Sequence, residues 1–407
     1  MTERSGIFAG LKVLDAASFI AAPAAATILS DFGADVIKIE PPGSGDPYRL
    51  LMGQPGLPVG DVNYFWTLEA RNKRSLAIDL KAPEGQAVLQ QLVRAADVFI
   101  TNMPLAARAR LGIGYEQLAT LNERLIYASF TGYGETGEEM HKPGFDSTVW
   151  WARSGLMDQV RNGTEVAPGR SMPGMGDHMA AVALFAAVAT ALYRRERTGK
   201  GGCVGSSLLA NGAWSNGCFL QAALSGATVK DRPPREQAGN PLSNHYRCKD
   251  GRWFILGISL AQEAKGYARF AELIGRPELA GDARFATREA RLKNAQALIR
   301  ELDQTFIQRD AAAWRMVLER EGFAVAPVAR TLDAAADPQM VASGVYVPME
   351  SAGGSKLTIS SPFWLVGEEK VSAGPAPDVG EHSDEILGEH GFDAAAIARL
   401  RQAGVVA

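Results

Sequence analysis

The sequence predicts an α/β protein with a large, Rossmann-like, doubly wound domain and a smaller, helix-rich α+β domain. Three observations lead to this prediction. Short apolar segments alternate with helix-length segments in the first part of the chain, which is typical of a parallel sheet covered by helices. The chain has 407 residues, more than one hydrophobic core usually serves. A stretch rich in proline and charge at 230–241 then separates this pattern from a different one.

The alternating pattern predicts the elements of the large domain in order. It begins with a strand at 11–15, an Ala-rich helix at 22–32 that ends at Gly33, and a strand at 35–40. Further strands are expected at 75–80, 98–100 and 125–130, with helices at 83–95 and 115–121. In such a sheet, ligands bind at the carboxyl ends of the strands.

A helix is predicted next, from the segment around Asp177 to Gly201. Asp177 stands just before the apolar run 179–193, and the run closes with basic residues and Gly199, so Asp177 is the expected N-cap. Most Asp residues in this position only satisfy free N–H groups. A carboxylate at a helix N-terminus after small residues is also an accessible nucleophile. The local pattern leaves both interpretations open.

The remaining segments predict a second, smaller domain and a return to strands. After a strand at 204–208 and a helix at 211–224, an Asp250-Gly251 turn between 245–248 and 253–256 predicts a β-hairpin. Helices are expected at 261–274, 285–308, 311–321 and 393–402, and strands at 324–328, 345–349 and 356–360.

Composition and motifs exclude several classes of function. The net charge is -3, from 42 basic and 45 acidic residues without a basic stripe, so neither nucleic acid nor a membrane surface is an expected partner. The first ten residues lack a signal-type apolar segment, and 179–193 is shorter than the about 20 residues that span a bilayer, so a cytoplasmic protein is expected. The turn after the first strand has no G-x-G-x-x-G, and the chain has no P-loop motif, so neither an NAD-dependent dehydrogenase nor a P-loop enzyme is expected.

The cysteines and histidines predict no metal centre. Cys203, Cys218 and Cys248 have no C-x-x-C spacing and are interpreted as buried thiols. The five histidines include no pair at metal-binding spacing. We therefore expect no bound metal.

Motifs along the whole chain resemble those of the class III CoA-transferases, the family that includes formyl-CoA transferase and carnitine CoA-transferase and also holds the α-methylacyl-CoA racemases. They occur in the family's order. These motifs lie at 33–40, 43–49, 72–75, Asn102, 131–134, 144–146, 176–177, 197–201 and 380–387.

The resemblance implies covalent catalysis by Asp177. Its carboxylate would attack an acyl-CoA thioester, and an anhydride and then an aspartyl-CoA thioester would carry CoA to an acceptor acid. CoA would be a substrate, without a tightly bound cofactor. The positions that match CoA-binding ones are Lys73, Arg74, Asn102, Arg110 and Tyr133.

Departures from the family's pattern leave the acceptor acid open. Ile20, with Phe19, stands where formyl-CoA transferases have a glutamine, and Thr131 stands where they have a lysine. Arg153, shortly after Trp150 and Trp151, is a candidate for binding the acceptor's carboxylate, against the interpretation of core tryptophans and a surface arginine. Glu135 is a candidate for orienting the substrate. A dicarboxylate or an aryl or hydroxy acid is favoured over formate.

Two alternatives to the transferase remain. A racemase needs an acid/base pair, but the family's Gly-His-Asp motif reads Gly144-Phe145-Asp146 here, and phenylalanine carries no proton. A non-catalytic CoA-binding protein would not need a nucleophile at Asp177. The resemblance also implies an interlocked homodimer and the domain division 1–225, 226–325 and 326–407, with the last segment completing the large domain.

Overall fold

The computed structural model describes residues 5–350 and 356–407, which form two compact units. The first unit comprises Met1–Met157, Arg170–Ser225 and Pro338–Ala407, and the second comprises Asp158–Gly169 and Gly226–Asp337. The expected division places boundaries at 226 and 326, and the observed units change at Gly226 and again between Asp337 and Pro338. The short segment 158–169 belongs to the second unit, which the sequence did not suggest.

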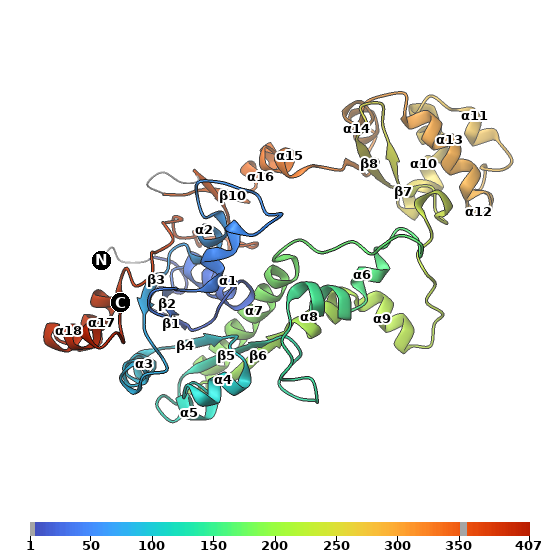
Figure 1. Cartoon of the computed structure of the whole chain (residues 1–407). Coiled ribbons are helices and arrows are strands. Elements are labelled where there is room, and N and C mark those ends of the chain that lie inside the picture. Colours follow the sequence, from blue (N-terminus) through green and yellow to red (C-terminus); the bar gives the residue numbers. More distant parts are fainter. Residues whose placement is uncertain (1–4, 351–355) are drawn as a thin grey trace. The chain divides into compact units, whose positions relative to one another are not determined.

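The first unit contains a six-stranded sheet in which every strand pairs in parallel, in the order β3-β2-β1-β4-β5-β6 (Figure 1). The strands are β1 (Lys12–Asp15), β2 (Asp35–Glu40), β3 (Arg74–Ala77), β4 (Val98–Thr101), β5 (Ile126–Thr131) and β6 (Gly202–Ser207). This strand order reverses direction between β1 and β4, where doubly wound sheets bind their ligands. The predicted fold class is confirmed.

Successive strand residues face opposite sides of the sheet, and both sides are buried. Val13 joins a core with the helices α1 (Ala21–Asp31) and α7 (Met175–Thr198) on one side. Leu14, the next residue, joins a second core with α3 (Pro83–Ala95) on the other. Because helices cover both faces, β4 is buried at every position and β5 at every position but Thr131, rather than at alternate ones.

Local sequence explains the helix boundaries of the first unit. α3 begins with Pro83 at its first position, has Glu84 in its first turn and Arg94 in its last, as the helix dipole favours. The other helices of this unit are α2 (Tyr64–Ala70), α4 (Leu105–Arg110), α5 (Tyr115–Ala119), α8 (Leu208–Ser215), α9 (Gly217–Leu224), α16 (Pro338–Ala342), α17 (Ser383–Glu389) and α18 (Ala394–Gln402), with a 3₁₀ helix Pro47–Gly53 and a π-helix Asp146–Arg153. α6 (Leu156–Gln159) spans the boundary between the units.

Helix α7 corrects two expectations. Its N-cap is Gly174, with φ 78°, so Asp177 lies inside the first turn and is not the N-cap. The helix has 24 residues because it extends beyond the apolar run at both ends, and by length and composition it is able to cross a membrane. No other helix among the described residues passes that test. In this fold α7 packs against α1, β5 and β6.

The second unit combines a three-stranded antiparallel sheet with helices around one core. The predicted hairpin is β7 (Ser243–Arg247) and β8 (Trp253–Gly257), and β9 (Val325–Pro327) pairs with β8. Its helices are α10 (Leu260–Leu273), α11 (Glu278–Gly281), α12 (Arg288–Lys293), α13 (Ala295–Phe306), α14 (Ala311–Glu319) and α15 (Thr331–Ala335), with a 3₁₀ turn Arg235–Gln237.

The C-terminal segment from Pro338 returns to the first unit. β10 (Tyr346–Pro348) and β11 (Leu357–Ile359) form an antiparallel pair. Val405 and Val406 are buried in the core that contains Leu14. One expectation is wrong: Cys203 and Cys218 are exposed, and only Cys248 is buried. Cys203 lies on β6, which is an edge strand and is covered by no further strand.

Candidate functional site

A cavity of about 570 Å³ opens at the carboxyl ends of the strands of the first unit. Segments that follow β1, β4 and β5, together with the start of α8 after β6, form its walls. Of the sequence-predicted site residues, Asp177, Asn102, Ile20 and Phe145 line it. The rest of the lining is Ser18, Phe19, Ala21, Pro47, Met103, Pro104, Leu105, Ala106, Phe130, Thr131, Gly132, Met140, His141, Lys142, Pro143, Gly144 and Leu208.

The Asp177 carboxylate faces this cavity without a partner. It is partly buried, and it forms no hydrogen bond or ion pair with any described residue. Burial, followed by the negative charges of Asp146 and Glu69, raises its pKa from 3.8 to about 7, while the neighbouring His178 opposes the shift. Burial is the largest of these causes, so the fold favours the protonated form of this carboxyl more than water does.

The backbone before Asp177 is held by close packing against the π-helix. A Cβ added to Gly176 would lie 2.6 Å from the Trp150 ring, so only glycine permits this contact. The Gly176 N–H also donates to Asp146 Oδ2 at 3.3 Å. Trp150 and Trp151 are buried and stacked with their ring centroids 5.8 Å apart, so they are core residues and not an acceptor wall.

The backbone N–H groups around the start of α7 are only partly used. Met175 N–H donates to the Met172 carbonyl and Gly176 N–H to Asp146, whereas Gly174 N–H has no acceptor among the described residues. The N–H of Asp177 has no acceptor among the described residues. This first-turn N–H is placed to stabilise negative charge that develops on an oxygen beside Asp177.

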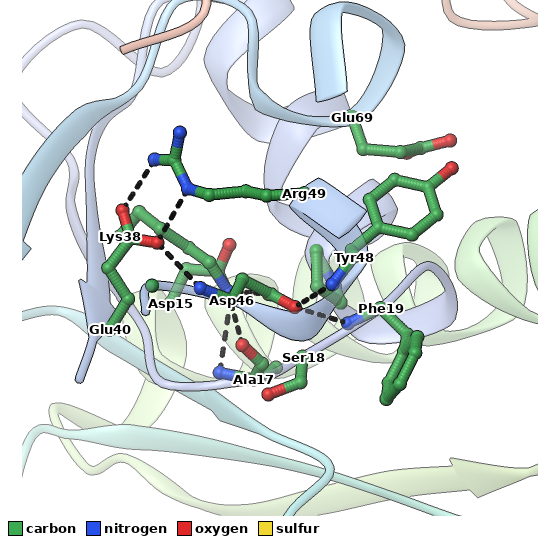
Figure 2. Close-up of polar contacts among 12 residues, drawn as sticks. Asp15, Ala17, Ser18, Phe19, Lys38, Glu40, Asp46, Tyr48, Arg49 and Glu69 are labelled. Carbon is green, nitrogen blue, oxygen red and sulfur yellow. Dashed lines mark hydrogen bonds and ion pairs between the residues drawn. The ribbon is translucent and has the colours of Figure 1, made fainter. Parts of the chain in front are cut away.

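His178 supports the loop from its other side. Its Nε2 lies 2.5 Å from Glu69 Oε1, and Glu69 is buried at the end of α2. Burial opposes protonation, but Glu69 outweighs it and raises the pKa of His178. Figure 2 shows the Tyr48 hydroxyl directed toward the same Glu69 carboxylate. The ring of His178 also packs on Gly174, where an added Cβ would approach it to 3.0 Å.

The loop after β1 is fixed by polar contacts on two sides. Asn102 Nδ2 donates to the Ser18 carbonyl at 2.7 Å, and its Oδ1 accepts from the Ser18 N–H at 2.8 Å. Asp46 Oδ1 accepts from the Phe19 N–H at 3.2 Å, and Lys38 pairs with Asp46 at 2.8 Å (Figure 2). Phe19 has φ 64°, a strained conformation for a residue with a side chain.

Lys73 and Arg74 lie away from this cavity, at the amino end of β3. The Lys73 side chain is fully buried and its Nζ contacts Asp15 at 2.9 Å. Arg74 forms ion pairs with Asp35, Glu385 and Glu389. These residues line a second cavity of about 840 Å³ at the opposite edge of the sheet. The nucleotide contacts that the resemblance implies for them stay a prediction.

Four other predicted residues lie near the first cavity without lining it. Tyr133 packs beside Gly144, and Glu135 pairs with the buried Arg108 at 3.1 Å. Arg153 is exposed and pairs with Glu139 at 3.1 Å, as expected for a surface arginine. Arg110 is exposed at the end of α4, whose first residues line the cavity.

Sequence reasoning missed two cavity residues, His141 and Lys142. Both are exposed, and Lys142 Nζ pairs with Glu139 at 2.6 Å. The available signal was their position between the motifs 131–134 and 144–146, which converge on this cavity. No group of three or more His, Cys, Asp or Glu side chains within 5–350 and 356–407 is arranged to hold a metal ion.

The fold and the site define an α/β enzyme class with known structural relatives. A CaiB/BaiF family protein from Brucella suis matches with a TM-score of 0.83 and 28% identity, covering 95% of this chain and 100% of that one. The family model described as CoA-transferase family III matches residues 8–383. The chain belongs to CoA-transferase family III, and the predicted family is confirmed.

Characterised relatives span almost the whole chain. The (R)-2-hydroxy-4-methylpentanoate CoA-transferase of Clostridioides difficile is 33% identical, covering 98% of both chains. The cinnamoyl-CoA:phenyllactate CoA-transferase of Clostridium sporogenes is 30% identical, covering 99% of this chain and 98% of that one. The human succinyl-CoA:glutarate CoA-transferase is 30% identical, covering 98% and 89%. The protein is thus an enzyme of the class III CoA-transferase type, which excludes the non-catalytic alternative.

Proposed function

We propose that this enzyme transfers CoA from an acyl-CoA thioester to a small carboxylic acid through covalent intermediates on Asp177. The state of the Asp177 side chain is the observation that supports this most. It is a carboxylate at a cavity wall, in the first turn of a helix, and no hydrogen bond or ion pair within 5–350 and 356–407 occupies its oxygens. Structural carboxylates of the same unit, such as Asp15 and Asp31, are held in ion pairs.

The proposed reaction runs in two matched halves. An Asp177 oxygen attacks the donor carbonyl carbon, the C–S bond breaks, and a mixed anhydride and CoA thiolate form. The thiolate then attacks the aspartyl carbonyl, which releases the donor acid and leaves an aspartyl-CoA thioester. The acceptor carboxylate attacks this thioester and releases the thiolate again, which takes the acyl group from the second anhydride. Asp177 is regenerated, with no net proton transfer.

The surroundings of Asp177 suit these steps. Only the ionised carboxylate is nucleophilic, and a pKa of about 7 leaves a substantial ionised fraction at neutral pH. The free N–H of Asp177 supplies a donor for the oxyanion of each tetrahedral intermediate. Anhydrides hydrolyse readily, and the apolar side chains of the cavity, among them Ile20 and Phe145, exclude water.

We assign the CoA moiety to the wall formed after β4 and β5. Asn102 lies there, and Arg110 and Lys142 are exposed cations at its edge that suit phosphate groups. Tyr133, beside Gly144, backs the same wall. Among the predicted CoA contacts, Asn102, Arg110 and Tyr133 are able to meet the ligand there, whereas Lys73 and Arg74 are held in ion pairs.

Mass spectrometry of the intact protein tests the covalent route. The enzyme is incubated with acyl-CoA donors and no acceptor, and we expect a mass gain of CoA less one water that hydroxylamine reverses. Asp177→Ala should show no gain. Glu84→Ala, which removes another acidic residue from a helix first turn, is the matched control and should show the full gain. Adduct formation on Asp177→Ala would contradict the proposal.

An acyl-CoA racemase is the second candidate, and one observation favours it. Phe145 carries no proton, but His141 is a titratable side chain that lines the same cavity as Asp177. Acyl-CoA is therefore incubated in deuterium oxide. The transferase leaves the α-carbon unlabelled, whereas a racemase would introduce deuterium there, and His141→Gln would then abolish the label.

We further propose that the enzyme acts in the cytoplasm as a homodimer, with interlocked chains as the family resemblance implies. Large apolar side chains on α8 and α9 are exposed in the single chain, including Trp214, Phe219 and Leu224. Such a surface is expected at an interface between subunits. Light scattering should give a mass of two chains, and Trp214→Glu should lower it toward one.

A further inference from the structure

We infer that the acid handled at Asp177 is a monocarboxylic acid with an apolar, branched or aromatic group, and not a dicarboxylic acid. This inference rests on the proposed function, because it takes the cavity at Asp177 as the place where the acyl group reacts. It follows from which side chains adjoin Asp177, how they are held, and where the cations of the cavity lie.

Two apolar side chains adjoin the nucleophile from opposite chain segments. Ile20 reaches the loop before Asp177, since a Cβ on Gly174 would lie 3.2 Å from Ile20 Cδ1. Phe145 directly precedes Asp146, whose carboxylate accepts from Gly176 N–H at 3.3 Å. Both side chains line the cavity. An acyl group bonded to the Asp177 oxygen would therefore lie in a cavity whose lining includes both of these side chains.

Phe19 is a third apolar residue in the cavity lining, and its backbone is strained. Phe19 has φ 64° and its side chain is 40% exposed, although a large apolar residue is normally buried. Asp46 holds its N–H, and Figure 2 shows its ring pointing away from that polar cluster. Phe145 is 62% exposed in the same cavity. Two exposed aromatic rings beside a reactive group suit an apolar ligand.

The polar groups of the cavity offer a second carboxylate no buried counter-charge, because its two basic side chains, His141 and Lys142, are both exposed. Asn102 uses both amide atoms on Ser18. Lys142 pairs with Glu139, with 58% of its side chain exposed to solvent. No arginine is among the described residues that line the cavity, and Arg153 pairs with Glu139. A charged second carboxylate held against Ile20 and Phe145 would thus be desolvated without a buried partner, which is unfavourable.

Acceptor competition on the full-length enzyme tests this inference. With one acyl-CoA donor, we measure kcat/KM for 4-methylpentanoate and 3-phenylpropanoate against glutarate and succinate. The apolar acids should exceed the dicarboxylates by about 100-fold, as expected where a buried charge would lack a partner. Dicarboxylates that match or exceed the apolar acids would overturn the inference.

A charge placed in the cavity sharpens the test. Phe145→Arg should lower kcat/KM for 3-phenylpropanoate and raise it for glutarate, so that the ratio of the two falls at least tenfold. Met316→Arg places the same charge on an exposed position of α14 and should leave the ratio unchanged. A constant ratio in Phe145→Arg would contradict the inference. Failure of the proposed function is separate: it would show as no adduct on Asp177, whichever acid is preferred.

Discussion

The two cavities of the first unit lie at opposite edges of the same sheet, and they treat charge in opposite ways. At the amino ends of the strands, Arg74 is held by three carboxylates. At the carboxyl ends, Asp177 forms no hydrogen bond or ion pair with the described residues, and its pKa is raised to about 7. Cavity volume does not identify the reactive site, since the cavity that Arg74 lines is the larger of the two. The unpaired group marks the reactive site, because only an unoccupied oxygen can attack a substrate.

Removing the charge of Asp177 is expected to have the largest effect, with opposite consequences for kcat and for stability. Asp177→Asn should lower kcat by on the order of 10⁴-fold or more, because the nucleophile is lost. The same change should raise the free energy of unfolding at pH 8. A carboxyl whose pKa is raised on folding costs stability once the pH exceeds its unfolded value, and the full cost, on the order of 2 to 4 kcal/mol, applies above its folded value of about 7. Urea unfolding at pH 8 measures it, and the gain should vanish near pH 4.

Breaking the Arg74 network should do the opposite. Arg74→Met leaves Asp35, Glu385 and Glu389 to repel one another, so we expect a loss of about 2 to 3 kcal/mol in unfolding free energy. Both kcat and the KM for acyl-CoA should stay within twofold. Arg269→Met removes two exposed ion pairs, with Glu272 and Glu321, and should change neither stability nor rate. A tenfold rise in KM with unchanged stability would assign Arg74 the nucleotide contact that the resemblance implies.

The pH dependence tests the unpaired carboxylate itself. Because the ionised form attacks, kcat should rise about tenfold per pH unit from pH 5 and level off above about 7. His178→Gln removes the one group that lowers the pKa of Asp177, so the midpoint of this profile should move to higher pH. Stopped-flow adduct formation against pH gives both midpoints. A midpoint near pH 4 would show that Asp177 is not desolvated in solution.

The smallest expected effect concerns the two hydrogen bonds between Asn102 and Ser18. Asn102→Ala removes two hydrogen bonds to Ser18, at a cost of about 1 to 2 kcal/mol, and should lower kcat/KM about tenfold because the cavity loop moves. Asn122→Ala is a close control, since Asn122 donates to the carbonyls of Val93 and Ala96 and accepts from Arg124 N–H, and it does not line the cavity. It should lose similar stability and keep full activity. Equal activity of the two variants would exclude a role for the Asn102–Ser18 hydrogen bonds in substrate binding.

Much of the fold could be predicted because the residues that begin and end a helix, or form a turn, lie within the element itself or next to it. Pro83, Glu84 and Arg94 delimit α3 where it was expected, and Asp250-Gly251 marks the hairpin. The π-helix Asp146–Arg153 was not foreseen, and its Trp150 packs against Gly176, a contact between segments that are distant in sequence.

The difference between local signals and contacts across the chain also explains which features of the site residues could be predicted. Asp177 was found because its helix and small-residue loop are local, and the motifs identified the family. Lys73 and Arg74 look like free cations in sequence, since their partners Asp15 and Glu385 are 58 and 311 residues away. The pKa of Asp177 likewise depends on Asp146 and Glu69, which approach it only in the fold.

Helix α7 links the nucleophile to a second fixed point. Its last turns carry Arg195, which pairs at 2.9 Å with Asp97, the residue just before β4, and β4 leads at its other end to Asn102. The Arg195–Asp97 ion pair thus links α7 to β4, and this link sets the spacing between Asp177 and the loop that contains Ser18. The wall at 139–145 takes no part in this link and is mostly exposed. Evolution can therefore vary this wall, and with it the range of acids accepted, without displacing the attacking oxygen.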